Sequence, residues 1–246
     1  MPDSVIAVFS DIHANLEALQ AVFADMNAHN PALRVCLGDI VGYAANPAQC
    51  LNAIRKSGCS VIMGNHDEAA ATDIDLGQMR DIAQHGIEFT RRKLTTDQRD
   101  YLAHLAFTLS HGDCQFVHAS LNAPSDWHYL MRESELAEHF ASQTHPFCFS
   151  GHTHVPGVWH LNRSGNIKSW RGAGRIEIPF GGKTLINVGS VGQPRDLCPD
   201  ACYALCNPVG RWVEFRRVKY DIARARRKIT RAGLPSYAGQ RLSLGR

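Results

Sequence analysis

Short apolar runs that end in polar residues alternate with amphipathic segments in the first part of the chain. Strands with polar tips are expected within residues 4–11, 34–43 and 60–70. Helices are expected between them, at residues 15–29 and 46–58; the second of these begins with Asn-Pro and ends at a glycine. The pattern therefore predicts an alternation of strands and helices.

The later part of the chain has a different pattern. Residues 69–106 carry no strand signal and predict helices, with polar breaks near residues 73–77 and 95–97. Five more strands are expected within residues 114–120, 146–155, 183–191, 202–207 and 211–220. Alternation followed mainly by strands predicts an α/β fold with two stacked sheets rather than one doubly wound sheet. No linker or repeat divides the chain, so we expect one domain over residues 1–246.

Composition and charge narrow the class of protein. The 246 residues contain no apolar run near the roughly 20 residues of a membrane helix, and the first residues lack the basic start of a secretory signal. The eight cysteines form no CxxC pair, and several lie in apolar runs, as free thiols of a cytoplasmic protein do. The net charge is +3, but residues 211–246 hold eleven Lys or Arg against two acidic residues. We favour a solvated basic face over a nucleic-acid surface, because no aromatic interleaving accompanies the charge.

The polar residues at the ends of the apolar runs are candidate metal ligands. In α/β folds, ligands gather at the carboxyl ends of strands, and these tips carry Asp, His or Asn. Such donors suit Mn, Fe, Zn or Ni with five or six ligands. Seven side chains are too many for one ion, but they fit two ions that share a carboxylate. The candidate metal ligands are Asp11, His13, Asp39, Asn65, His118, His152 and His154.

Two choices within this set depend on position along a strand. His111 competes with His118, but His111 precedes a Gly-Asp turn whereas His118 ends the strand, where the other candidates lie. His152 and His154 are one residue apart, and on a regular strand their side chains would point in opposite directions. A loop, or two neighbouring ions, is therefore expected at this pair.

Six segments in chain order resemble the calcineurin-like metallophosphoesterase superfamily, in particular its small single-domain bacterial and archaeal members. They read SDIHANLEAL, LGDIVGY, GNHDEA, VHAS, SGHTHVP and NVGSVGQPRD, and they extend from about Asp11 to Asp196. The resemblance implies a four-layer α/β/β/α sandwich of two mixed sheets flanked by helices, with residues 69–106 near the rim of the active site. Ala119 departs from the glycine that often follows the histidine of the fourth segment, but it removes no ligand.

The resemblance also implies roles for these residues and an activity, phosphatase or phosphodiesterase. A hydroxide held between two divalent ions would attack phosphorus, and His66 would act as general acid, oriented by Asp67. One ion would be held by Asp11, His13, Asp39 and His154. The other would be held by Asp39, Asn65, His118 and His152.

Other side chains are candidates for substrate contact. Asn65 and His66 would face the phosphate, and Tyr43 would form a wall of the pocket. Arg195 would bind the phosphate or would instead pair with Asp196. His128 and Tyr129 are candidates for the pocket lining. The remaining histidines are expected at the surface: His29, His85, His104, His139, His145 and His160.

Two other functions are compatible with this fold. A catalytically inactive interaction scaffold would typically lack some ligands or the catalytic histidine, whereas all of these positions are filled here. A nuclease would agree with the basic end of the chain, but such enzymes usually carry extra DNA-binding segments. We therefore expect a phosphorylated small molecule or a nucleotide as substrate, with neither nucleic acid nor a membrane as partner.

Overall fold

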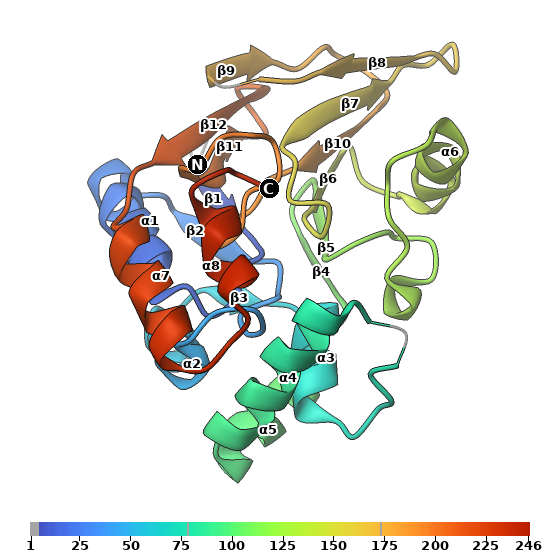
Figure 1. The fold of residues 1–246 in the computed structure, drawn as a ribbon. Helices are drawn as coiled ribbons and strands as arrows, with labels where there is room; N and C mark the ends of the chain where they lie inside the picture. The colour runs from blue at the N-terminus through green and yellow to red at the C-terminus, as the bar shows by residue number, and fades with distance from the viewer. Residues whose placement is uncertain (1–4, 78, 173) are drawn as a thin grey trace.

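Twelve strands form two six-stranded sheets in the computed structural model, which describes residues 5–246 except 78 and 173 (Figure 1). Ser4, at the start of the first expected strand, and residue 78, in the expected helical segment, lie outside the described residues. The first sheet has the order β3 (Ser60–Val61), β2 (Leu33–Cys36), β1 (Ile6–Phe9), β11 (Ala201–Asn207), β12 (Trp212–Val218) and β9 (Gly174–Glu177). The second has the order β4 (Thr108–His111), β5 (Cys114–Val117), β6 (Phe147–Ser150), β10 (Lys183–Asn187), β7 (Gly157–Leu161) and β8 (Ile167–Trp170).

Both sheets are mixed. Strands β1, β2 and β3 run parallel, and β11, β12 and β9 continue that sheet in antiparallel pairs. In the second sheet β5, β6 and β10 run parallel, and the outer pairs are antiparallel. The parallel strands give each sheet one edge at which several carboxyl ends meet. The expectation of two stacked mixed sheets is confirmed.

The two sheets pack face to face through an apolar core. Side chains alternate along β1, so Ile6 and Val8 enter the core between the sheets, while Ala7 and Phe9 face the outer helices. The second sheet contributes Phe116 and Phe149, whose rings stack with centroids 5.3 Å apart. Because β1 is buried on both faces, its sequence is a continuous apolar run.

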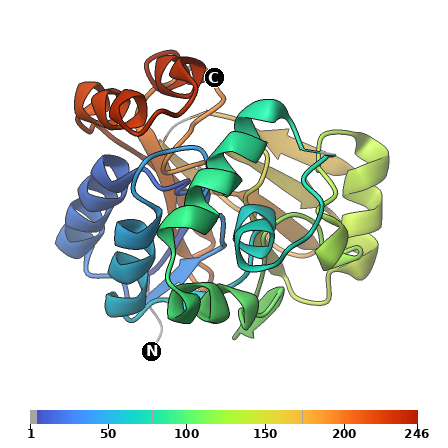
Figure 2. The same ribbon diagram turned by 60° about the horizontal axis from the view of Figure 1, so that its bottom comes forward.

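Helices cover the outer faces, as Figure 2 shows with α1 and α7 on one side and α6 on the other. Helix α1 begins after Asn15, whose side chain accepts a hydrogen bond from the Ala18 amide. None of the helices in the described part of the chain is long and apolar enough to cross a membrane. The helices are α1 (Leu16–His29), α2 (Pro47–Lys56), α3 (Asn65–Ala71), α4 (Asp81–Lys93), α5 (Thr96–Ala103), α6 (Glu133–Ser142), α7 (Ile222–Arg231) and α8 (Ser236–Leu242), with a 3₁₀ turn at Pro124–Asp126.

Some elements differ from those expected. All eight expected strands form, but β4, β7, β8 and β9 are additional. β8 and β9 lie at sheet edges and carry exposed polar residues, so their sequences lack the apolar alternation that marks a half-buried strand. Residues 65–68, expected as the polar tip of the third strand, form the start of α3 instead, and Asp67 in its first turn accepts the Gly64 amide.

Two histidines expected at the surface are buried. His139 on α6 is 0% exposed and His160 on β7 is 3% exposed, where it bonds to the hydroxyl of Thr184. Nδ1 of His139 accepts a hydrogen bond from the Leu121 amide, 3.2 Å away, so the ring is neutral at that nitrogen. Burial, and then the charge of Lys183, lower the pKa of His139 to about 4. The expectation of a surface position for these two residues was wrong.

The buried His139 ring should make stability depend on pH. An unfolded histidine has a pKa of about 6.5, so below that value the unfolded chain binds a proton that the native chain refuses until about pH 4. The wild type should therefore lose about 3 kcal/mol more unfolding free energy than His139→Gln between pH 7 and pH 4. Urea unfolding at several pH values measures this, with the exposed His104→Gln as control; parallel curves for wild type and His139→Gln would contradict it.

Candidate metal centre

All seven candidate ligands follow the carboxyl ends of parallel strands. Loops after β1 and β2 of the first sheet carry Asp11, His13 and Asp39, and Asn65 begins helix α3 after β3. Loops after β5 and β6 of the second sheet carry His118, His152 and His154. Because the sheets are stacked, the two sets face each other, and their His and Asp members gather in buried groups. His111 is exposed at the end of β4, and it pairs with Cys114 at the start of β5. It therefore lies far along the strand from His118, which follows the carboxyl end of β5.

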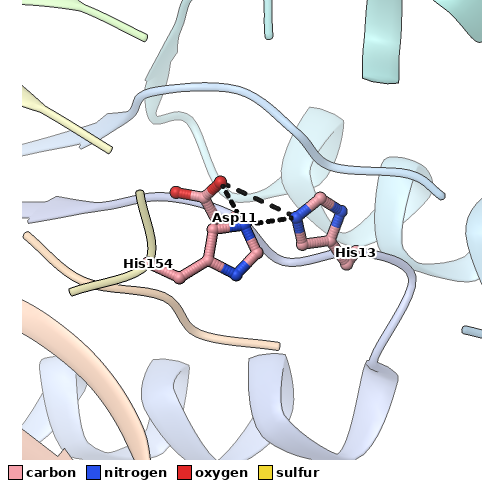
Figure 3. Close-up of side chains that lie close together, drawn as sticks. All are labelled: Asp11, His13 and His154. Carbon is pink, nitrogen blue, oxygen red and sulfur yellow. Dashed lines mark hydrogen bonds and ion pairs between the residues drawn. The ribbon is translucent and has the colours of Figure 1, made fainter. Parts of the chain in front are cut away.

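One group consists of Asp11, His13 and His154 (Figure 3). Nε2 of His154 is 3.1 Å from Oδ1 of Asp11, and Nε2 of His13 is 3.6 Å from the same oxygen. The two Nε2 atoms are 3.1 Å from each other. Three donor atoms thus converge on one point.

A second group consists of Asp39, His118 and His152. Oδ2 of Asp39 is 3.5 Å from Nε2 of His118 and 3.6 Å from Nε2 of His13, which belongs to the first group. The Asp39 carboxylate therefore lies between the two groups. Asn65 follows Gly64 at the start of α3, and its Oδ1 is buried without a hydrogen bond.

Most of these residues have an unusual backbone conformation. The φ angles of Asp11, His13, Asp39, His152 and His154 lie between 49° and 64°, in the left-handed region. Asp, Asn and His enter this region more readily than most residues, and such outliers concentrate at functional sites. Because His152 and His154 lie in a loop and not on a strand, their side chains can face the same site.

Hydrogen bonds fix how the histidine rings face the site. Nδ1 of His13 lies 3.2 Å from the backbone carbonyl of Val41, and Nδ1 of His118 lies 2.8 Å from that of Leu37. Nδ1 of His154 lies 2.5 Å from the backbone carbonyl of Gln193. A carbonyl only accepts, so each Nδ1 donates, which leaves the lone pair of Nε2 directed into the site. This is the usual orientation of metal-binding histidines.

The electrostatics of the pocket favour bound cations. Burial by itself would raise the pKa of Asp11 and of Asp39, but nearby histidines hold both well below the usual range, so both carboxylates are ionised. Burial lowers the pKa of His152 to about 3 and that of His154 to about 4, which leaves these rings neutral, the form that binds metals. The ion pairs of Asp11 and Asp39 in the described chain involve histidines only, with no Lys or Arg.

Unsatisfied polar atoms provide a test of whether metal ions fit. Nε2 of His118, Nε2 of His152 and Oδ1 of Asn65 are buried and find no hydrogen-bond partner in the described structure. Leaving such atoms unpaired is costly, and the two buried carboxylates, Asp11 and Asp39, have only histidines as ion-pair partners in the described chain. Divalent ions would satisfy all of these groups, so the residues present fit the metals expected from the sequence.

His66 and Asp67 lie beside the two groups. The His66 amide donates to Oδ1 of Asp39 at 2.8 Å, and the ring forms a third group with His13 and Asp39. Asp67 differs from its expected role of orienting the His66 ring. Its carboxylate accepts the amides of Ile40 and Val41, at 2.9 and 3.3 Å, besides that of Gly64. These bonds hold the loop that carries Asp39, and none of the hydrogen bonds of Asp67 in the described structure goes to the His66 ring.

Glycines allow the loops to approach closely. A Cβ atom on Gly64 would lie 2.3 Å from both the amide nitrogen and Oδ1 of Asp39. A Cβ atom on Gly151 would lie 2.5 Å from Oδ2 of Asp11, the oxygen that accepts the His152 amide. Both contacts are far shorter than real Cβ atoms make, so any larger residue would displace a carboxylate.

Tyr43 and Arg195 lie at one side of the centre. The Tyr43 ring is 4.7 Å from the rings of both His13 and His66, measured between centroids. The Arg195 guanidinium contacts the Tyr43 hydroxyl at 3.5 Å, and its Nε is buried without a partner. Helix α4 packs directly against this wall, because a Cβ atom on Gly86 would lie 2.4 Å from the Tyr43 amide.

Aromatic residues lie at the opposite side. The Tyr129 ring stacks on His152 at 4.1 Å and is 45% exposed, whereas His128 points to an exposed pair with Asp126. Trp127, which the sequence reasoning missed, packs edge-on to His118 and donates to Glu68. The sequence offered one indication of this position: Trp127 is two residues before Tyr129, which was already a candidate for the pocket lining.

Much of the basic end of the chain is neutralised. Arg216 pairs with Asp25 and Glu214, and Arg224 and Lys228 on α7 pair with Glu17. Arg226, Arg227 and Arg231 remain on the exposed face of α7. The stretch is thus in large part an ion-paired strand and helix face.

A four-layer sandwich with Asp, His and Asn converging between the strand ends defines the metallophosphoesterase class of α/β proteins. The model of the calcineurin-like phosphoesterase superfamily domain matches residues 5–208, and the chain belongs to this superfamily. An uncharacterized protein of Methanocaldococcus jannaschii is 35% identical over 253 residues, covering 100% of both chains. The crystal structure of a metallophosphoesterase from Sphaerobacter thermophilus is 34% identical, with a TM-score of 0.86, over 99% of this chain and 100% of that one.

A hypothetical protein from Pyrococcus horikoshii shares the fold at 20% identity, with a TM-score of 0.81 over 99% of each chain. The family, the fold and the buried ligand groups together support a metal-dependent phosphoesterase in general. Helices α7 and α8 follow the part of the chain that the family model matches.

Proposed function

We propose that the protein is a binuclear metal-dependent phosphoesterase that hydrolyses a phosphorylated small molecule or nucleotide. The observation that carries this proposal is the position of Asp39. One of its oxygens is within 3.6 Å of the inward-facing nitrogens of both His13 and His118, which belong to different ligand groups. A carboxylate between two ligand groups is the arrangement that two neighbouring ions need.

The proposed ligand sets follow from these groups. Asp11, His13 and His154 would hold one ion together with Asp39. His118, His152 and Asn65 would hold the other, again with Asp39. Divalent ions of the type that accepts Asp, His and Asn donors, such as Mn, Fe, Zn or Ni, would supply Lewis-acid charge to the phosphoryl oxygens and acidify the attacking water.

The other residues would act on the substrate directly. His66 lies within reach of both ligand groups and would give a proton to the leaving oxygen. Burial lowers the pKa of the free ring to about 3, and the negative charge of a bound phosphate would raise it again. Arg195 and Tyr43 would bind the phosphoryl oxygens from the side. Asp67 would keep the Asp39 loop in place through its three amide bonds.

A hydrolysis assay tests this proposal. The protein is freed of metal with a chelator, loaded separately with Mn²⁺, Fe²⁺, Zn²⁺ or Ni²⁺, and incubated with bis(p-nitrophenyl) phosphate and p-nitrophenyl phosphate. At least one metal should give turnover that the chelator abolishes and that renewed metal restores, with about two metal ions bound per chain by elemental analysis. Absence of turnover with every metal would favour an inactive scaffold, and activity at a single bound ion would refute the binuclear centre.

A further inference from the structure

The segment that follows β5 carries an exposed tyrosine beside the metal centre. Tyr129 stacks on the His152 ring, with 4.1 Å between the ring centroids and 27° between the ring planes. One face of the tyrosine ring is therefore covered by a candidate metal ligand. Among the described residues, His152 is the only aromatic partner of Tyr129, and the tyrosine is still 45% exposed. Much of its second face is thus open to solvent.

The segment is anchored on both sides of this tyrosine. Before it, the indole N–H of Trp127 donates to the Glu68 carboxylate of α3 at 2.8 Å, and the indole ring packs edge-on to His118 with centroids 5.7 Å apart. After it, Leu130 is 6% exposed and belongs to the apolar cluster beneath α6. Tyr129 is therefore held at a fixed position, although its own ring is only partly covered.

The backbone of the same segment is strained. Ala123 and Trp127 have φ angles of 50° and 57°, in the left-handed region that residues other than Gly, Asn and Asp rarely enter. Such conformations persist only where the surroundings enforce them, and they concentrate at ligand-binding and catalytic sites. An exposed ring on a strained and anchored segment is the geometry of a ligand contact that is formed in advance.

The position of Tyr129 determines which group could lie on it. In the proposed function, a phosphate is bound at the metal centre next to His152. The open face of Tyr129 points away from His152, and a ring stacked on it would lie roughly 4.5–7 Å beyond the tyrosine. A nucleobase has this reach, because a sugar holds it several bonds away from its phosphate. Aromatic side chains bind bases of any sequence by stacking, since every base has a π face.

We propose that the open face of Tyr129 is a stacking platform for a nucleobase, so that the substrate class is nucleotides. The base would lie on Tyr129 while the phosphate occupies the metal centre. That this phosphate is the reacting group rests on the proposed function. Tyr129 is the specificity residue, because it would contact the base and not the reacting atoms.

Three phosphonates with stable P–C bonds test the platform in the metal-loaded protein. Phosphonomethoxyethyl-adenine carries a base, and ethoxymethylphosphonate is the same chain without the base. Cyclohexylethoxymethylphosphonate carries an apolar ring that is not planar. With metal in excess over the probe, calorimetry should show that the wild type binds the adenine compound at least about fivefold more tightly than either of the others.

Substitution of Tyr129 should remove this preference. Tyr129→Leu should reduce the affinity ratio between the adenine compound and the base-free compound to less than about twofold, whereas Tyr129→Phe keeps the ring and should keep the ratio. The ratio cancels a general effect on the metal site, because both probes bind through the same phosphonate. Phe180→Leu is the control: it removes an aromatic ring that is 89% exposed before β10, at the end of that strand opposite the ligands, and should leave the ratio unchanged.

The outcomes separate the platform from the proposed function. The same ratio in wild type and Tyr129→Leu would overturn the platform, and so would a wild type that binds the cyclohexyl compound as tightly as the adenine compound. Hydrolysis of bis(p-nitrophenyl) phosphate by the wild type and by Phe180→Leu reports the proposed function independently. An adenine preference that depends on Tyr129 in a protein without hydrolysis would keep the platform and refute the phosphoesterase, whereas hydrolysis without that preference would do the reverse.

Discussion

The Asp39→Asn variant is expected to lose both metal ions and at least about 10³-fold in kcat/KM. Its carboxylate is the only one in the proposed centre that lies between the two ligand groups. Asparagine keeps the shape, tolerates the left-handed φ of 52° and still accepts the His66 amide, so the change removes mainly the charge. Lewis-acid assistance is worth several kcal/mol, and each tenfold in rate corresponds to about 1.36 kcal/mol.

Metal content and turnover of this variant are measured together. Elemental analysis after dialysis should fall from about two ions to less than one per chain, while hydrolysis of bis(p-nitrophenyl) phosphate falls in parallel. Asp100→Asn is the matched control, because it makes the same change at an exposed position of α5 and should alter neither. Loss of a single ion, with the other held as tightly as before, would show that Asp39 serves only one of them.

The His66→Gln variant is expected to lose activity in a way that depends on the leaving group. A general acid contributes roughly 10²–10⁴-fold when the leaving oxygen needs a proton. An alkyl phosphate ester, whose alkoxide is a poor leaving group, should therefore lose about that factor. A p-nitrophenyl ester, whose phenolate departs without a proton, should lose only about tenfold.

Kinetics on both types of ester and metal content distinguish this role from the alternative. The His66 ring is close enough to His13 and Asp39 to be a ligand itself. In that case His66→Gln would release metal and would slow both esters equally. With a general acid, metal content stays at the wild-type level. His85→Gln, at an exposed position of α4, controls for the loss of a histidine.

The candidate site residues could be chosen from the sequence because each follows an apolar run and because the segments that hold them resemble one family. Their convergence needed the structure, since it depends on how the two sheets stack. Asp67 was expected to contact the His66 ring, but nothing in the sequence shows that backbone amides from a loop 26 residues earlier take its carboxylate.

The sequence also gave a wrong expectation for two histidines, His139 and His160, which are buried and not at the surface. His139 lies on a helix with polar neighbours, yet the amide of Leu121, 18 residues away, holds it inside. An isolated polar residue in an amphipathic segment gives no sign of such a partner. The candidate ligand histidines were easier to recognise because each lies at the end of an apolar run, in a segment that also holds glycine, serine or aspartate.

The candidate ligands come from two different sheets, so the metal site can form only after both sheets have packed together. His13 and His154 meet across 141 residues of sequence, and Asp39 meets His118 from the opposite sheet. A chain with only one sheet formed would hold part of each proposed ligand set and could bind neither of the two proposed ions fully. Such long-range contacts form late. Metal affinity is therefore a reporter of completed assembly: tight binding during refolding should appear only when the two sheets have come together.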